Sequence, residues 1–280
     1  MAALTDPLAV PLAGPLEITC DESGSEGERL IGGTTDVFAH ASVQIDADVA
    51  AACIDRVRVD ARSPATEVKA SVVLRQQNRR VLEWLLAPGG PLHGNAHVHL
   101  TEKVFHLVAT FAAPLDDPDA TLTLYHEGPR SLGYGAWHRM LAAYNEWVRD
   151  APPEAAGVVL DPLVPALEAA VRHWAGAGRP VAIVHDIQGA LTPDRIADLE
   201  RRCGDDLASL TFIDSETDPR IQVTDFLAGA ARRIASEELN GRRDDGLAAL
   251  LRPYVSSSSI WAHGPSWARI GRTPVNRPRG

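Results

Sequence analysis

Hydrophobic and polar positions along the chain follow two periods, one typical of strands and one typical of helices. Short apolar runs bounded by turn residues predict strands. Residues 96–111 alternate at first and fit either one strand or a strand followed by a helix. The other predicted strands are 16–24, one or two strands within 29–45, 179–186, and 209–215.

Helical spacing alternates with these strands. A cap, a proline in the first turn and a closing glycine mark 192–204 as a helix, and Pro88-Gly89-Gly90 ends another. The helices predicted from this pattern are 48–59, 65–86, 131–149, 161–175, 192–203 and one beginning at 219. Alternation of the two element types predicts an α/β fold with a mixed sheet.

The last of these helices, within "SETDPRIQVTDFLAG" (215–229), carries an unusual polar stripe. Asp218 can cap it, and Pro219 suits the first helical position. Gln222, Asp225 and Gly229 form a stripe beside an apolar face. Glycine costs about 1 kcal/mol relative to alanine inside a helix. Taken alone, this segment fits a helix whose polar stripe is a solvated edge.

Composition narrows the class of protein. The chain has 280 residues, 45% of them hydrophobic, enough for a sizeable core. It shows no apolar run of membrane-spanning length and no convincing signal peptide, so we expect no membrane partner. Three scattered cysteines fit a reduced cytoplasmic protein. The net charge of −10 argues against a broad nucleic-acid surface and leaves a local basic groove open.

Lysine is rare among the cations of this chain. Of 27 basic residues, only Lys69 and Lys103 are lysine. A compact ammonium is a point charge that the planar guanidinium of arginine does not reproduce. The two lysines are therefore candidates for a specific role, with chance retention as the alternative.

Acidic residues follow three predicted strands. Asp21, Asp186 and Asp214 lie at or just past the ends of apolar runs. Ligands gather at the carboxyl ends of strands in open α/β sheets, so neighbouring parallel strands would bring these acids together. An antiparallel neighbour would separate some of them. Clustered carboxylates suit Mg²⁺ or Mn²⁺, and two such ions activate a water for attack on a phosphodiester.

Other polar residues have simpler interpretations. His185 points to the sheet face opposite Asp186 if the strand continues, which favours packing over catalysis. His97 and His99 share one strand face and suit zinc or nickel, although such a pair is more often incidental. Asp214 is expected to shape the turn at Ser215. Arg75, Arg79 and Arg80 fit a solvated basic face or contacts to phosphates.

Four motifs together resemble a known family. They are "CDESG" near the start, "EVKAS" at 67–71, "VHD" at the end of a later strand, and "IDSETDPRIQVTDFLAG". In this order they are similar to the motifs of the family known as domain of unknown function 3800, over residues 16 to about 240. That family is classed with the ribonuclease H-like superfamily. The resemblance implies an α/β, ribonuclease H-like mixed sheet flanked by helices.

The resemblance also implies a set of site residues. Asp21, Glu67, Asp186 and Asp225 would be catalytic and would bind Mg²⁺ or Mn²⁺. Lys69 would be catalytic beside them. Lys103 and Gln222 would contact substrate, and Gly229 would let the last helix approach the sheet closely enough to bring Asp225 towards Asp21.

The expected domain organisation has three parts. Residues 1–15 form a loosely ordered arm, and 16–252 form the ribonuclease H-like domain, with 131–175 as a helical insertion or subdomain. Residues 253–280 form a basic tail with four arginines and no acids. The oligomeric state is left open.

The sequence is compatible with three functions. The first is metal-dependent phosphodiester hydrolysis, most plausibly by a nuclease, with nucleic acid as partner. The second is a metal-dependent enzyme acting on a small molecule, and the third is a non-catalytic partner-binding protein on the same fold. A continuous basic groove leading to the acids favours the first, a closed pocket under 131–175 favours the second, and carboxylates that fail to converge favour the third.

Overall fold

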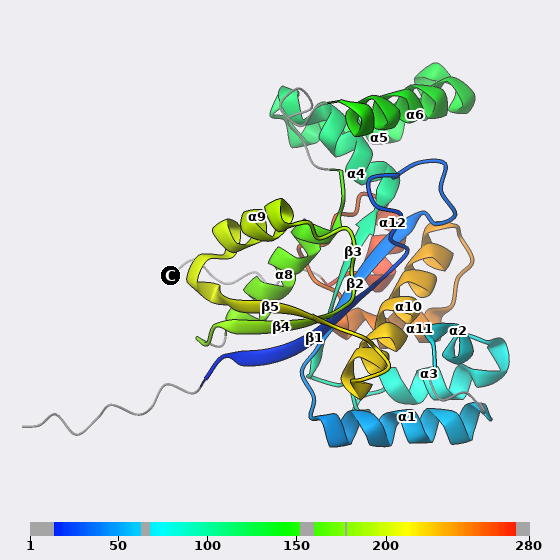
Figure 1. The fold of residues 1–280 in the computed structure, drawn as a ribbon. Coiled ribbons are helices and arrows are strands. Elements are labelled where there is room, and N and C mark those ends of the chain that lie inside the picture. The colour runs from blue at the N-terminus through cyan, green and yellow to red at the C-terminus, as the bar shows by residue number, and fades with distance from the viewer. Residues whose placement is uncertain (1–13, 63–67, 152–159, 177, 273–280) are drawn as a thin grey trace, which may run out of the picture.

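A five-stranded mixed sheet organises the molecule, which is described here by a computed structural model (Figure 1). The structure describes residues 14–62, 68–151, 160–176 and 178–272. The strands are β1 (Leu16–Ser23), β2 (Val37–Val43), β3 (Ala96–Glu102), β4 (Val181–Asp186) and β5 (Leu207–Ile213). Their order is β3-β2-β1-β4-β5, with β2 antiparallel to β1 and β3, and with β4 parallel to β1 and β5. The predicted α/β fold with a mixed sheet is confirmed.

Strand alternation gives the sheet two buried faces. In β2, Val37 and Ala39 contribute to one core cluster while Phe38, between them, contributes to another. Every residue of β2 is buried, as expected of a strand covered on both sides. Side chains one residue apart therefore belong to different environments.

The first face is covered by α10 (Pro219–Leu239), which packs on β1 and β2. The predicted start is confirmed, because Asp218 accepts a hydrogen bond from the N–H of Arg220 and Pro219 occupies the first turn. Gln222 and Gly229 are buried, so their stripe is not a solvated edge. The helices that pack against α10 on this side are α1 (Ala47–Ala61), α2 (Ala70–Val73), α11 (Asp245–Leu251) and α12 (Gly264–Ile270), and α3 (Arg79–Leu86) packs on α1, α2 and α11.

The opposite face is covered by α8 (Leu163–Ala175), with α9 (Pro193–Cys203) beside it. A third group of helices stands apart from the sheet at one end of the molecule (Figure 1). It comprises α4 (Lys103–Ala112), α5 (Pro118–Leu132) and α6 (Tyr134–Asp150), which share a small core around Trp137 and Leu141. The segment 131–175 thus divides between two places, with α6 in this helical group and α8 on the sheet.

Two segments differ in detail from the sequence pattern. Residues 96–111 are a strand followed by a helix, β3 and α4. The single helix expected over 65–86 is instead α2, a 3₁₀ turn (Gln76–Asn78) and α3, with 63–67 outside the described residues. Extended backbone at Arg75 ends α2, and the side chain of Asn78 donates to the carbonyl of Val72 at 2.7 Å, which holds the bend.

The segment after residue 252 packs on the domain as far as the structure describes it. Its backbone pairs with the edge strand β3, with Ser256 N donating to Val98 O and Ile260 N to Leu100 O. Trp261 packs against the core cluster on the α10 side. Among the described ranges, none of the helices has both the length and the apolar character needed to cross a bilayer.

Gly229 allows α10 to pack closely on a neighbouring element. That element is not the sheet, which the sequence resemblance implied. A methyl group added at Gly229 would lie 2.5 Å from the Cβ of Ala70, so the glycine accommodates α2 and not the sheet. Gly229→Ala should therefore destabilise the protein. The gain in helix propensity of about 1 kcal/mol is outweighed by overpacking, which typically costs about 1–3 kcal/mol.

Chemical denaturation of Gly229→Ala and of the double variant Gly229→Ala/Ala70→Gly measures this contact. The second substitution removes the opposing methyl and should recover much of the loss, as coupled neighbours do. A Gly229→Ala protein as stable as the parent would contradict the close packing of the two helices.

Candidate functional site

Two carboxylates, those of Asp186 and Asp225, lie near enough to Asp21 on the α10 side of the sheet for their charges to act on it. Asp21 lies near the end of the central strand β1. Cys20 pairs with His185 in the parallel ladder, which brings the next residues, Asp21 and Asp186, level with each other on adjacent strands. Asp225, in the second turn of α10, is close enough to contribute to the electrostatic environment of Asp21. The arrangement is the one expected if β1 and β4 were parallel neighbours.

Burial strongly perturbs the carboxyl group of Asp21. Its side chain is buried, and its pKa is raised from 3.8 to about 9, first by burial and then by the charges of Glu22, Asp225 and Asp186. A hydrogen bond from the N–H of Glu22 to Asp21 Oδ1, at 2.7 Å, acts in the opposite direction. A cation among these carboxylates would favour the ionised form of Asp21.

Backbone N–H groups hold the other two carboxylates. Asp225 Oδ2 accepts from the N–H of Ala70 at 2.7 Å, at the first residue of α2. Asp186 Oδ1 accepts from the N–H of Ser215 at 3.2 Å. These bonds tie α10 to α2 and β4 to the turn that follows β5, so each carboxylate is fixed by a different part of the chain.

The turn at Ser215 brings Lys69 and Gln222 to the same place. Lys69 Nζ donates to Ser215 Oγ at 3.3 Å, and Gln222 Nε2 donates to the carbonyl of Ser215 at 3.1 Å. Asp214 shapes the turn, as expected, by accepting from the N–H of Glu216. Lys69, Gln222 and Asp186 therefore share Ser215 as a common contact. Sequence reasoning missed Ser215 as a connecting residue, although it lies within the "IDSETDPRIQ" motif.

Two of the predicted residues are not in this group. Glu67 lies outside the described residues. Lys103 follows β3, which is separated from β1 by β2, and its buried Nζ donates to Glu26 Oε2 and Thr35 Oγ1, both at 2.6 Å. Burial lowers the pKa of Lys103, and the contacts with Glu26 oppose this. This ion pair gives Lys103 a structural role in the connection between β1 and β2, and the substrate contact expected for it stays a prediction.

Glu22 and His185 lie behind the carboxylates, on the α8 face. His185 is fully buried, as expected from its alternation with Asp186, and its Nε2 is 3.6 Å from Glu22 Oε2. Gln188 donates to the other oxygen of Glu22. The pKa of Glu22 is raised to about 7, first by burial and then by the charges of Asp186 and Asp161. Sequence reasoning did not select Glu22. Strand alternation could have placed it, because a residue next to Asp21 in β1 lies on the opposite face of the sheet.

The donor set is one for a hard divalent cation, since carboxylate oxygens are the ligands that Mg²⁺ and Mn²⁺ prefer. In the part of the chain that the structure describes, no group of three or more His, Cys, Asp or Glu side chains is already arranged around an ion position. That part excludes Glu67. The ring of His97 stacks on that of His173 with a centroid distance of 4.3 Å.

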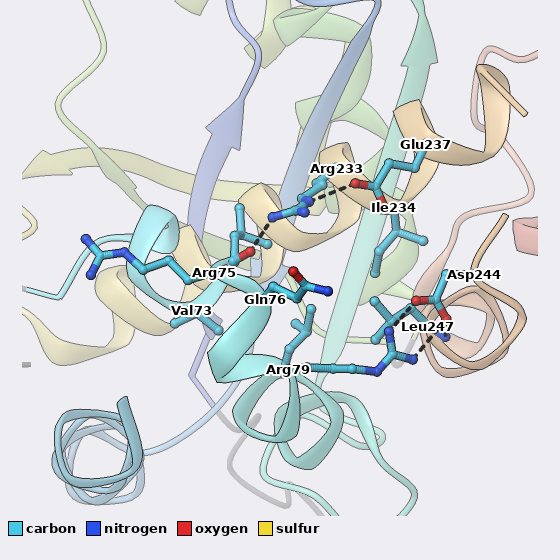
Figure 2. A pocket seen from close by; sticks show the side chains of 11 residues that line it. Val73, Arg75, Gln76, Arg79, Arg233, Ile234, Glu237, Asp244 and Leu247 are labelled. Carbon is cyan, nitrogen blue, oxygen red and sulfur yellow. Dashed lines mark hydrogen bonds and ion pairs between the residues drawn. The ribbon is translucent and has the colours of Figure 1, made fainter. Parts of the chain in front are cut away.

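A cavity of about 350 Å³ lies further along α10, between that helix and the α2–α3 segment (Figure 2). Its floor includes Val73, Ile234 and Leu247. Figure 2 shows ion pairs at its rim, Arg233 with Glu237 and Arg79 with Asp244. Two of the three arginines that line the cavity are thus paired with acids, and the third, Arg75, is exposed.

Three comparisons with known proteins found no match. No family model, no curated protein and no solved structure matches it. The resemblance drawn from the four motifs therefore stays a prediction.

The raised pKa of Asp21 predicts a pH-dependent stability difference. The folded state holds the proton that the unfolded state releases near pH 3.8, so the contribution of Asp21 is greatest below that pH and is lost as pH rises towards about 9. Asp21→Asn does not titrate. Without metal, the free energy of unfolding of this variant minus that of the parent should increase with pH, by at most about 1.4 kcal/mol per pH unit.

Urea denaturation of both proteins in EDTA, at several values of pH between 5 and 9, measures this difference directly. Because the two proteins differ only at residue 21, the pH dependence of groups that do not interact with Asp21 cancels. What remains reports Asp21 together with its charged neighbours. A constant difference across the range would show that Asp21 ionises normally in the folded protein.

Proposed function

We propose that this chain is a divalent-metal-dependent phosphodiester hydrolase, a nuclease on a ribonuclease H-like fold. The observation that carries the proposal is the convergence of Asp21, Asp186 and Asp225 from β1, β4 and α10 on one face of the sheet. The mixed sheet flanked by helices agrees with the fold that the motif resemblance implies. Structural ion pairs alone do not account for an acid group buried among like charges.

Asp21, Asp186 and Asp225 would hold Mg²⁺ or Mn²⁺, together with Glu67. Ions bound there supply Lewis-acid activation of a water and stabilise the leaving oxygen of a phosphodiester. The protein's own residues set the geometry: Ser215 fixes Asp186, and Ala70 fixes Asp225. Lys69, placed beside Asp186 through Ser215, would neutralise and position the phosphate. Gln222 would orient the same turn from α10.

A metal-dependent enzyme acting on a small molecule is the second candidate. The ion pairs beside the cavity along α10 favour it, because the pairing of Arg79 with Asp244 and of Arg233 with Glu237 offsets most of the positive charge there. Arg75 is the remaining cation among the residues that line this cavity. The net charge of −10 is no obstacle to a small substrate. Nucleic acid is the partner only under the first candidate.

Activity and thermal stability with Mn²⁺ test the first proposal. We expect Mn²⁺ or Mg²⁺ to raise the melting temperature through mass action on the folded state, and to support cleavage of DNA or RNA oligonucleotides. Asp21→Asn should abolish the rise in melting temperature. It should also lower the cleavage rate by more than the roughly 10- to 100-fold typical of changes outside the ligand shell. Asp150→Asn, the same change at an exposed residue at the end of α6, should keep both.

The outcomes separate the three functions. Metal-dependent hydrolysis of a small phosphodiester, with intact oligonucleotides, would favour the second candidate. A melting temperature and an activity that are both indifferent to Mn²⁺ would leave the non-catalytic binding protein.

Lys69→Arg tests the role of the compact ammonium. The variant keeps the charge, so stability should stay within about 0.5 kcal/mol of the parent. Cleavage should fall, because a longer planar guanidinium does not fit the position of Nζ beside Ser215. Arg149→Lys, an exchange in the opposite direction at an exposed residue of α6, serves as the control and should be silent. A fully active Lys69→Arg enzyme would remove Lys69 from the mechanism.

A further inference from the structure

A second pocket, of about 400 Å³, lies on the α8 side of the edge strand β3. It is formed by three parts of the chain: β3, α8 and the serine segment 256–260. The converging carboxylates face α10, on the other side of the sheet. The pocket is therefore separate from the proposed catalytic site. Its volume is within the range of small-molecule sites, about 300–1,000 Å³.

His99 lines this pocket and has unused hydrogen-bonding capacity. The residue is 2% exposed, and neither ring nitrogen has a hydrogen-bond partner among the residues that the structure describes. Burial lowers the pKa of His99 to about 4, so the ring is neutral at neutral pH. A neutral imidazole offers one N–H donor and one acceptor, and leaving them unpaired in a buried place is costly. A ligand with hydroxyl groups can satisfy both, since a hydroxyl donates and accepts.

Serine hydroxyls form another wall. The backbone of this segment is tied to β3 at Ser256 and Ile260, so the residues between them loop outward. Ser256 Oγ and Ser258 Oγ are 2.8 Å apart, and Ser257 is exposed. All three serines line the pocket. Three adjacent hydroxyls provide several donors for the oxygens of an anion.

The surrounding charges favour an anion. Glu168 is the acidic residue lining the pocket, and it is paired with Arg172 and lies 3.7 Å from Arg202. Arg272 adds a further positive charge, which acts to lower the pKa values of His97 and His173. Arg202 is also paired with Asp198, at 2.8 Å, so three guanidinium groups stand against two carboxylates and leave a net positive charge. Arg172 is 70% exposed, so its guanidinium can turn towards a ligand without a large change in packing.

We propose that this pocket binds a small phosphate monoester that also carries hydroxyl groups, such as a sugar phosphate. The phosphate lies against the hydroxyls of Ser256–Ser258 and the guanidinium of Arg172. The hydroxyl groups of the ligand face His99. The site does not depend on the proposed hydrolase activity, because it shares no residue with the carboxylate group.

Calorimetric titration in EDTA tests the site, with ribose 5-phosphate, inorganic phosphate and ribose as probes. The Asp21→Asn variant is titrated beside the parent to exclude binding at the carboxylates, and should give the same result. We expect ribose 5-phosphate to bind saturably at one site, more tightly than inorganic phosphate, and ribose not to bind. Ser257→Asp, which places a negative charge in the pocket, should weaken binding tenfold or more, about 1.4 kcal/mol.

Two further variants complete the experiment. Arg172→Gln should also weaken binding, while Ser131→Asp, the same charge change on the exposed surface of α5, should leave it unchanged. Absence of saturable binding, or binding that Ser257→Asp does not weaken, would overturn the proposal. Equal affinity for inorganic phosphate and ribose 5-phosphate would overturn the assignment of the ligand's hydroxyl groups to His99.

Discussion

The hydrogen bond from the N–H of Ala70 to Asp225 links the parts of the molecule on which the site depends. Ala70 is the first residue of α2, where a backbone N–H has no partner within its own helix, and the carboxylate of α10 supplies one. Gly229, one turn later on α10, leaves the space that the side chain of Ala70 occupies. Once α2 is fixed in this way, Lys69 just before it lies against Ser215, and Ser215 in turn holds Asp186.

The same bond helps to explain the polar stripe of α10. Gln222, Asp225, Gly229 and Arg233 follow one another at helical spacing. Asp225, Gly229 and Arg233 contact Ala70 or Leu74 of the α2 segment, and Gln222 contacts the turn at Ser215. A helix packed on a sheet with one side and on a second helix with another has little solvated surface. This is why α10 carries buried residues around most of its circumference.

Local patterns predicted much of this architecture, because strands and caps depend on neighbours in sequence. The strand ends that carry Asp21 and Asp186, and the start of α10 at Pro219, could all be read from such patterns. The side chain of Asn78, which bends the 65–86 segment, acts through a hydrogen bond that no periodicity signals. Gly229 and its neighbour Ala70 are 159 positions apart in the chain. Lys103 and Glu26, which form an ion pair, are 77 positions apart. Such contacts depend on the completed fold, and sequence pattern alone does not specify them.

The pairing of 256–260 with β3 has a consequence for association between molecules. β3 ends the sheet on one side, and an uncovered edge strand offers a row of backbone groups to any passing chain. Here Val98, Leu100 and Glu102 already exchange hydrogen bonds with the serine segment and Ile260. The chain thereby occupies its own edge, and growth of the sheet from one molecule to the next is blocked on that side. Residues 256–260, which line the pocket beside α8, thus also protect the edge of the sheet from aggregation.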